Sequence, residues 1–180
     1  MTLLAAPLFD PPAVGDAPID APAVLNRARA AQGDWARSPL RRRLAVIRRA
    51  RRLMVDRADA LAATVTHPHR RNDAETLGSE VMPLVEAARS LERRAPRILR
   101  GRSPRAGRPM IGRDLRMTVT RDPWGVVLVI GPANYPLMLP GVQVLQALVA
   151  GNGVLFKPGR RGATSAEALR GLLVDAGLPA

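Results

Sequence analysis

The feature that most constrains this chain is a pair of short apolar runs separated by a helix-length apolar stretch. Residues 126–130 form an almost unbroken run of Val, Leu and Ile that ends in a Gly-Pro turn. Residues 152–156 form a second run, which ends at Lys157. The stretch between them, 137–150, is long enough for a crossover helix. Because unbroken apolar runs are typical of parallel strands buried on both faces, the pattern predicts a parallel strand–helix–strand unit.

A second helix is predicted after that unit, over residues 163–176, with Gly177 at its C-cap. The order strand, helix, strand, helix is that of an α/β protein with a doubly wound, Rossmann-like parallel sheet. A sheet of only two inner strands leaves one flank of each strand open. We therefore interpret residues 123–180 as the first part of an α/β domain, and we expect the chain to be the front portion of something longer.

The residues before this unit are predicted to be helical. Residues 1–21 are rich in Pro, Ala and Asp and are expected to form a flexible arm. In the helical segment, 22–112, a short helix over 23–34 precedes a longer one, with Ser38 as its cap and Pro39 at its first position. The apolar positions of the longer helix recur at helical spacing and are expected to form one buried stripe: Leu40, Leu44, Ile47, Met54, Ala58, Leu61 and Val65.

A third helix is predicted from about residue 72 to about residue 100. Pro83 and Pro96 lie inside it and should bend or shorten it, because proline lacks the backbone N–H that a helix interior needs. Residues 101–112 hold Gly, Pro and Arg and are expected to form a surface loop. Residues 113–122 include a β-prone stretch and are expected to form an edge strand that leads into the sheet.

Composition excludes several classes of protein. Hydrophobic residues make up 47% of the 180, which is enough for a packed core. We expect no transmembrane helix, because no apolar run is long enough, and no leader, because no basic residue precedes Arg27. His67 and His69 have no third metal ligand near them in the sequence, and the chain contains no cysteine. These features favour a cytoplasmic protein without a metal site and without a membrane partner.

The net charge of +13 raises the question of an acidic partner or nucleic acid. Nearly all of the cations are arginine, and Lys157 is the single lysine. So complete a bias is typical of the coding preference of a genome. No aromatic residues alternate with the arginines, as they do in single-strand binders. We therefore interpret the arginines as a solvated outer surface, and a non-catalytic, arginine-rich interaction module is the alternative function.

Two polar side chains follow the predicted strands. The amide of Asn134, in the turn after the first strand, either bonds its own turn or presents an uncharged donor to negative charge that develops beside it. Lys157 is either an incidental surface lysine or a compact ammonium that donates where a guanidinium would be too bulky. Ligands of open α/β sheets bind at the carboxyl ends of the strands, which is where both residues are expected.

Over residues 24–180 the sequence resembles the N-terminal third to two-fifths of the aldehyde dehydrogenase superfamily. Members of this superfamily oxidise an aldehyde: a cysteine thiolate attacks the carbonyl, a hydride passes to NAD or NADP, and an acid or acyl product leaves. The resemblance rests on four motifs in the family's order, Pro123-Trp124-Gly125-Val126-Val127, Ile130-Gly131-Pro132-Ala133-Asn134-Tyr135-Pro136, Ala150-Gly151-Asn152-Gly153-Val154 and Lys157-Pro158.

The resemblance implies roles for individual residues. Asn134 falls where the family places the amide that donates to the oxyanion, and Lys157 where it places the lysine that holds the adenosine ribose of the cofactor. Residues 123–180 would then begin the dinucleotide-binding domain. The partners implied are a small aldehyde and, in the full-length form, further copies of the same chain. Backbone and apolar contacts to the cofactor would come from Ile130, Gly131, Pro132 and Ala133.

Three departures from the family pattern carry expectations of their own. Ala133 stands where the family often has tryptophan, so the cleft should be roomier. Arg160 stands where it often has glutamate, and together with Arg161 it adds positive charge, which predicts tolerance of or preference for NADP. The family's nucleophile, its glutamate base and its Gly-rich pyrophosphate turn have no counterpart in residues 1–180. We therefore expect the 180-residue chain alone to have no dehydrogenase activity.

Overall fold

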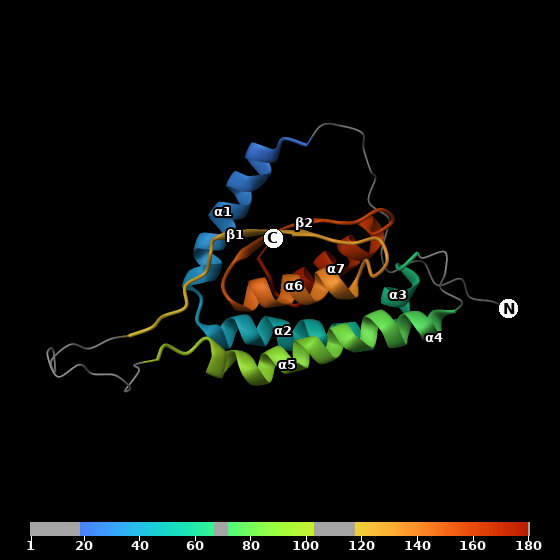
Figure 1. Cartoon of the computed structure of the whole chain (residues 1–180), viewed down its shortest axis with the longest axis horizontal. Coiled ribbons are helices and arrows are strands. Elements are labelled where there is room, and N and C mark those ends of the chain that lie inside the picture. Colours follow the sequence, from blue (N-terminus) through green and yellow to red (C-terminus); the bar gives the residue numbers. More distant parts are fainter. Residues whose placement is uncertain (1–18, 67–71, 103–117, 180) are drawn as a thin grey trace, which may run out of the picture.

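The computed structural model describes residues 19–66, 72–102 and 118–179, and it arranges them in layers (Figure 1). The strands lie along one side, α6 and α7 lie beneath them, and α2 and α5 form the far layer. Helix α1 slants past one end of the strands. The elements are α1 (Ala21–Arg37), α2 (Leu40–Asp56), α3 (Ala58–Ala63), α4 (Asp73–Thr76), the π-helical segment η1 (Leu77–Val81), α5 (Met82–Ile98), β1 (Val126–Ile130), α6 (Met138–Val149), β2 (Gly153–Lys157) and α7 (Ala163–Asp175).

Strands β1 and β2 form a parallel pair, and α6 is the crossover between them. The register runs from Val126 opposite Gly153 to Ile130 opposite Lys157. Each element lies within about one residue of the range that the sequence predicted, and α7 follows as expected. The predicted α/β class, with N-terminal helices that lead into an incomplete parallel sheet, is therefore confirmed.

The prediction that β1 is buried on both faces is wrong for this structure. Val129 is 2% exposed, whereas Leu128 and Ile130 are 59% and 63% exposed. Successive side chains of a strand point to opposite faces, so Val129 faces the core while Leu128 and Ile130 lie on the outer face. Within the described part of the chain nothing covers these two side chains. The apolar run therefore places Leu128 and Ile130 on an outer face of the two-stranded sheet that no described element packs against.

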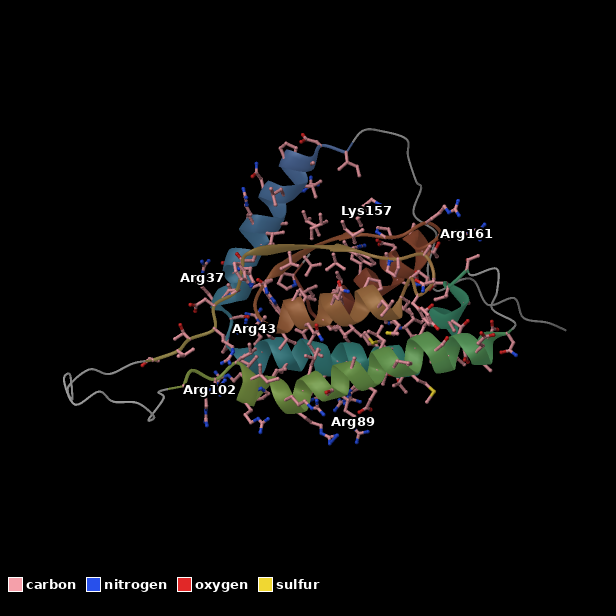
Figure 2. The ribbon with its side chains drawn as sticks, in the orientation of Figure 1. Arg37, Arg43, Arg89, Arg102, Lys157 and Arg161 are labelled. Carbon is pink, nitrogen blue, oxygen red and sulfur yellow. The ribbon has the colours of Figure 1, made fainter. Side chains whose placement is uncertain are left out.

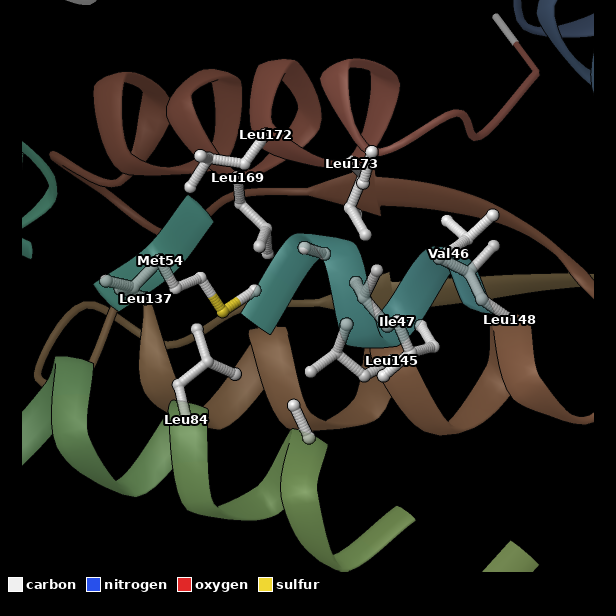
Figure 3. Packing of buried hydrophobic residues seen from close by; sticks show 14 of the residues in the cluster. Val46, Ile47, Met54, Leu84, Leu137, Leu145, Leu148, Leu169, Leu172 and Leu173 are labelled. Carbon is white, nitrogen blue, oxygen red and sulfur yellow. The ribbon is translucent and has the colours of Figure 1, made fainter. Parts of the chain in front are cut away.

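The core lies where α2, α5, α6 and α7 meet (Figure 3). Helix α6 is central, because it contacts both strands on one side and α2 and α5 on the other. Burial of aliphatic surface is the main stabilising term here, since the chain has few aromatic residues. The largest side chains that are fully buried are Ile47, Met54, Leu61, Leu84, Leu137, Leu145, Leu169 and Leu172.

The long helix predicted after Ser38 is two helices, and Ser38 does not cap it. The helix is interrupted between α2 and α3 at Arg57, whose φ of −115° and ψ of 29° are not helical. The N-cap of α2 is Pro39, without a side-chain cap. The Ser38 hydroxyl instead donates to the Trp35 carbonyl at 2.7 Å and closes α1. The apolar stripe survives the break, because Leu44 and Met54 of α2 and Leu61 of α3 are all buried.

The third predicted helix is continuous from Asp73 to Ile98 but changes its winding in the middle. The N–H of Met82 bonds the carbonyl of Leu77, a π-type bond to the fifth residue back. Pro83 follows immediately, and it has no N–H to give to the Ser79 carbonyl. We infer that the wider turn accommodates this proline. Pro96 lies in the last turn of α5, which ends two residues later.

Several predictions fall wholly or partly outside the described residues. These are the arm up to residue 18, His67 and His69, most of the 101–112 loop, and the first half of the edge strand predicted over 113–122. The described half, 118–122, is not a strand. Its pairing is a single antiparallel bridge between Arg102 and Val119, with N···O distances of 3.0 and 2.8 Å. An edge strand there is therefore not observed.

None of the helices in the described residues is both long and apolar enough to cross a membrane. The described residues also contain no group of three or more His, Cys, Asp or Glu residues that could hold a metal ion.

One ion-pair cluster joins α2 to α5 and predicts that the stability of the fold falls in acid. Glu92 of α5 accepts from Arg51 Nε at 2.6 Å and Arg48 Nε at 3.2 Å of α2. Burial alone would raise the pKa of Glu92, but hydrogen bonds from both arginines outweigh it and lower the pKa below 4.5. A lowered pKa stabilises the folded state above the carboxyl's ordinary range, and this contribution is lost as the pH falls through the folded-state pKa. We therefore expect Glu92→Gln to lose less stability on acidification than the wild type does.

Urea unfolding at neutral pH and at a pH below 4.5 measures this difference. Glu86→Gln is the matched control, because Glu86 lies on the same helix and its contact with Arg89 is long, at 3.7 Å, and exposed. Glu86→Gln should keep the pH dependence of the wild type. Equal acid sensitivity in Glu92→Gln and the wild type would contradict the prediction.

Candidate functional site

The carboxyl ends of both strands meet at one edge of the molecule. Ile130 and Lys157 are opposite one another in the register, and the N–H of Gly131 donates to the Lys157 carbonyl at 2.9 Å. The loop after β1 and the residues after β2 therefore begin side by side. This edge is the position at which open α/β sheets bind ligands.

The two loops then continue in direct backbone contact. A Cβ atom added to Gly159 would lie 2.4 Å from the carbonyl oxygen of Pro132 and 2.7 Å from that of Gly131. Both distances are far below van der Waals contact, so only glycine allows the backbones to approach this closely. Farther along, the backbone at Gly162 is close to Pro136, the last proline of the first loop. The loops thus form one packed unit.

The predicted site residues occupy this unit, and none of them lies on a helix. Asn134 and Ala133 are exposed in the loop between β1 and α6, Pro132 is half-buried, and Gly131 is buried. Lys157 is exposed at the end of β2. Because Lys157 is opposite Ile130, both side chains lie on the outer face of the sheet. Figure 2 shows Lys157 over the strands and Arg161 at the end of the molecule where α7 begins.

The charge at this edge is positive. Lys157, Arg160 and Arg161 are all exposed, and neither loop contains an aspartate or a glutamate. Arg161 has a φ of 67°, in the left-handed region, at the turn into α7. Helix α7 begins at Ala163, and Gly162 at its N-cap provides no side-chain acceptor. The positive end of the helix dipole adds to the three cations, so the edge suits a phosphorylated ligand.

Sequence reasoning missed Glu80, which lies directly behind the first loop. This glutamate of η1 is fully buried, and its Oε2 accepts from the N–H groups of Leu137 at 2.9 Å and Met138 at 2.8 Å. These N–H groups lie at the start of α6. In dinucleotide-binding α/β domains, the N-terminus of the helix after the first strand is where the pyrophosphate usually binds. One sequence signal could have revealed it: Glu80 stands four and eight residues before Leu84 and Ala88, on the buried stripe of that helix.

Asn152, in the third motif, is also buried, and its contacts are structural. Its Oδ1 accepts from the N–H of Gly125 at 3.1 Å, and its Nδ2 donates to the carbonyl of Ala147 at 3.1 Å. The side chain thus joins the entry of β1 to the end of α6. Gly151 precedes it with a φ of 94°. The hydrogen bonds account for Asn152 and the positive φ accounts for Gly151, in both cases without a ligand.

A cavity of about 550 Å³ lies between α1, β2 and α7 and reaches the second loop at Pro158. Its walls are mostly apolar and include Trp35, Val144, Leu148, Phe156 and Leu173. None of the predicted site residues lines it. The predicted site residues therefore lie outside this cavity, and Ala133, Asn134, Lys157 and Arg160 among them are exposed.

Parallel strands joined by a crossover helix, with polar loops at their carboxyl ends, define a doubly wound α/β protein of the kind that binds ligands at that edge. Comparison with known proteins narrows this class to one family. Residues 12–180 match the model of the aldehyde dehydrogenase family. The chain belongs to this family, as its motifs predicted.

Individual relatives agree with this assignment. The chain is 35% identical over 179 residues to N-succinylglutamate 5-semialdehyde dehydrogenase of Chromobacterium violaceum, which covers 97% of this chain and 34% of the relative. Its structure is similar to that of an NADP-dependent glyceraldehyde-3-phosphate dehydrogenase from Bacillus halodurans complexed with NADP, with a TM-score of 0.78, 30% identity, and coverage of 86% of this chain and 32% of the other. Succinate-semialdehyde dehydrogenase from Burkholderia pseudomallei is similar over 86% and 31% of the two chains, with a TM-score of 0.76 and 28% identity. The chain thus spans about a third of the length of these relatives.

Proposed function

We propose that this chain forms the first part of the NAD(P)-binding half of an aldehyde dehydrogenase. The whole protein would oxidise an aldehyde to an acid or acyl product with NAD or NADP as hydride acceptor. The observation that carries the proposal is the pairing of Ile130 with Lys157, with the Gly131–Lys157 hydrogen bond beyond it. This pairing joins two family motifs into one edge.

The exposed residues of this edge fit a dinucleotide. Lys157 would donate to the ribose hydroxyls of the adenosine, and Arg160 with Arg161 would face its 2′-phosphate. The lack of carboxylates in both loops supports this assignment, because a carboxylate would repel that phosphate. The Bacillus halodurans relative is described as a complex with NADP. The cofactor would be in contact with Ile130, Gly131, Pro132 and Ala133.

Asn134 would act on the substrate rather than on the cofactor. Its amide N–H would donate to the oxygen of the aldehyde as negative charge develops there, and loss of one such donor typically costs about 10²–10³ in rate. Its loop suits this role, because hydrogen bonds fix both ends, at Gly131 and at Leu137. The thiolate that attacks the carbonyl has to come from residues outside this chain, which contains no cysteine.

Other features of the whole protein remain predictions. They are the division into an arm, a helical segment over 22–112 and a dinucleotide-binding domain from residue 123, assembly into a homo-oligomer, and a cytoplasmic location. The arginine-rich alternative gains no support from the arrangement of the cations. In Figure 2, Arg37, Arg89 and Arg161 project from different sides of the molecule and do not gather on one face.

Titration of the chain with NADP⁺ and NAD⁺ tests the proposal. We expect backbone amide NMR shifts to change at residues 130–134 and 157–162 as either nucleotide is added, with tighter binding of NADP⁺. Lys157→Met should weaken binding of both nucleotides by about 10-fold or more, because a hydrogen bond to a charged group contributes about 1.5–3 kcal/mol. Arg160→Glu should weaken NADP⁺ binding more than NAD⁺ binding.

Arg170→Met is the control for a lost cation. Arg170 is exposed on α7, pairs with Glu167 of the same helix and lies outside both loops. Its replacement should leave both affinities unchanged. Two results would overturn the assignment of the site: shift changes that fall elsewhere in the chain and not at residues 130–134 and 157–162, or equal nucleotide affinities in Lys157→Met and Arg170→Met. A clear preference for NAD⁺ would overturn the role of Arg160.

A further inference from the structure

A buried carboxylate lies beside the candidate site, and the proposed function does not use it. Glu80 is fully buried and bonds the first backbone N–H groups of α6, those of Leu137 and Met138, at 2.9 and 2.8 Å. A carboxylate in the interior is costly unless strong donors surround it. The N–H groups of Leu137 and Met138 and the positive end of α6 contribute to this compensation.

The π-helical winding of η1 affects the direction in which the Glu80 side chain points. Glu80 lies within this segment, between the α-helical turns of α4 and α5. A wider turn rotates the residues that follow it relative to an α-helix, so it sets the direction of the Glu80 side chain. Such turns are frequent at functional sites. Pro83 keeps this winding in place, since it cannot restore the α-type bond to Ser79.

The bonds from Leu137 and Met138 to Glu80 fix one end of the loop that carries Asn134. At the other end, the N–H of Gly131 is held by the Lys157 carbonyl at 2.9 Å. Between these anchors, Pro132 and Pro136 each restrict the backbone φ angle. Asn134 stands midway between the two prolines. A short loop with two anchors and two prolines has little conformational freedom, so the position of the Asn134 amide depends on both anchors.

We propose that Glu80 is a positioning residue for the site: by bonding the N–H groups of Leu137 and Met138, its carboxylate holds the Asn134 loop in the geometry that the oxyanion donor needs. The carboxylate also occupies the start of α6, so a phosphate of the cofactor has to bind elsewhere on this edge. The catalytic meaning of this inference rests on the proposed function, whereas the restraint on the loop does not.

NMR of the 180-residue chain tests the restraint directly. In Glu80→Met, which keeps the length of the side chain but removes the acceptor, we expect amide hydrogen exchange at Leu137 and Met138 to become about 10- to 100-fold faster. The side-chain amide resonances of Asn134 should shift in the same variant. Glu80→Gln keeps an acceptor oxygen at the same reach, so it should restore most of the protection and the resonance positions of the wild type.

Glu92→Met separates positioning from general stability. Glu92 is a second carboxylate of the same helical stretch, but Arg48 and Arg51 of α2 bond it, so its partners lie on another helix and not on the Asn134 loop. Its loss should lower the stability without moving the Asn134 resonances. If Glu80→Met does not fold, Glu80→Asp provides the test of the restraint. Its shorter side chain cannot keep the bonds from Leu137 and Met138 at their present length. An unchanged loop in whichever of these two variants is folded, or an equal change in Glu92→Met, would overturn the proposal.

Nucleotide titration of the same samples keeps the two proposals apart. A loop that responds to Glu80 in a chain that binds neither NADP⁺ nor NAD⁺ would defeat the proposed function and leave the restraint intact. If a nucleotide binds at residues 157–162 but the Asn134 loop does not respond to substitution of Glu80, the restraint is defeated and the proposed function is left intact.

Discussion

Leu145→Ala is expected to lower the free energy of unfolding by about 2–5 kcal/mol, the range for removing a large aliphatic side chain from a core. Leu145 is 0% exposed, and Figure 3 shows it beside Ile47 at the contact of α6 with α2. Helix α6 contacts the strands as well as α2 and α5, so a cavity on it loosens every layer. Domains are typically stable by only about 5–15 kcal/mol. The expected loss is therefore a large part of the total stability.

Urea unfolding followed by circular dichroism measures this loss, and Leu139→Ala is the matched control. It removes the same atoms from the same helix, but Leu139 is 39% exposed. Its removal should cost under about 1 kcal/mol, because a side chain that is already partly in water loses less on truncation. Equal losses in the two variants would show that α6 is not the centre of the core.

Gly159→Ala is expected to separate the two loops of the candidate site. The added Cβ would lie 2.4 Å from the carbonyl oxygen and 2.5 Å from the carbonyl carbon of Pro132. The φ of Gly159 is outside the left-handed range, so alanine meets a steric clash and not a conformational penalty. Overpacking typically costs about 1–3 kcal/mol, and we expect the upper end because backbone atoms cannot rotate away. The shift changes that NADP⁺ causes at residues 130–134 should disappear in this variant.

Gly171→Ala is the control for this substitution. Gly171 lies inside α7, and a Cβ atom there would meet nothing within 4 Å. Alanine should therefore stabilise the helix by about 0.5–1 kcal/mol. Urea unfolding and NADP⁺ titration of both variants compare the two effects. Wild-type stability and wild-type nucleotide binding in Gly159→Ala would show that the close approach of the loops is dispensable.

The local elements of this protein were predictable because local chemistry defines their ends. A Gly-Pro turn ends β1, a Gly-Asn-Gly sequence leads into β2 at Gly153, and Gly177 follows α7 with a φ of 93°. The boundary at Ser38 was misplaced for the same reason, since serine followed by proline fits the end of one helix as well as the start of the next. The break at Arg57 has no proline or glycine to signal it.

The candidate site was predictable in part. The motif residues pointed to a strand end, and parallel pairing then places Ile130 beside Lys157 by geometry alone. The contact between Gly159 and Pro132 could not be read from the chain, because it depends on how two loops fold over the same edge. Glu80 was missed because its partners, Leu137 and Met138, are distant in sequence and are backbone groups that carry no residue-type signal.

By itself the sequence determined the order of helices and strands, the parallel crossover unit and the family motifs, since each depends on the spacing of apolar residues and on where glycine and proline stand. Only the tertiary structure decided which face of β1 is covered, which carboxylate bonds the start of α6, and how closely the loops of the site approach. The physical reason is that burial and hydrogen bonding depend on which groups meet in space. Leu128 and Val129 are neighbours of similar hydrophobicity, yet one is 59% exposed and the other 2%, because only one of them faces the packed helices.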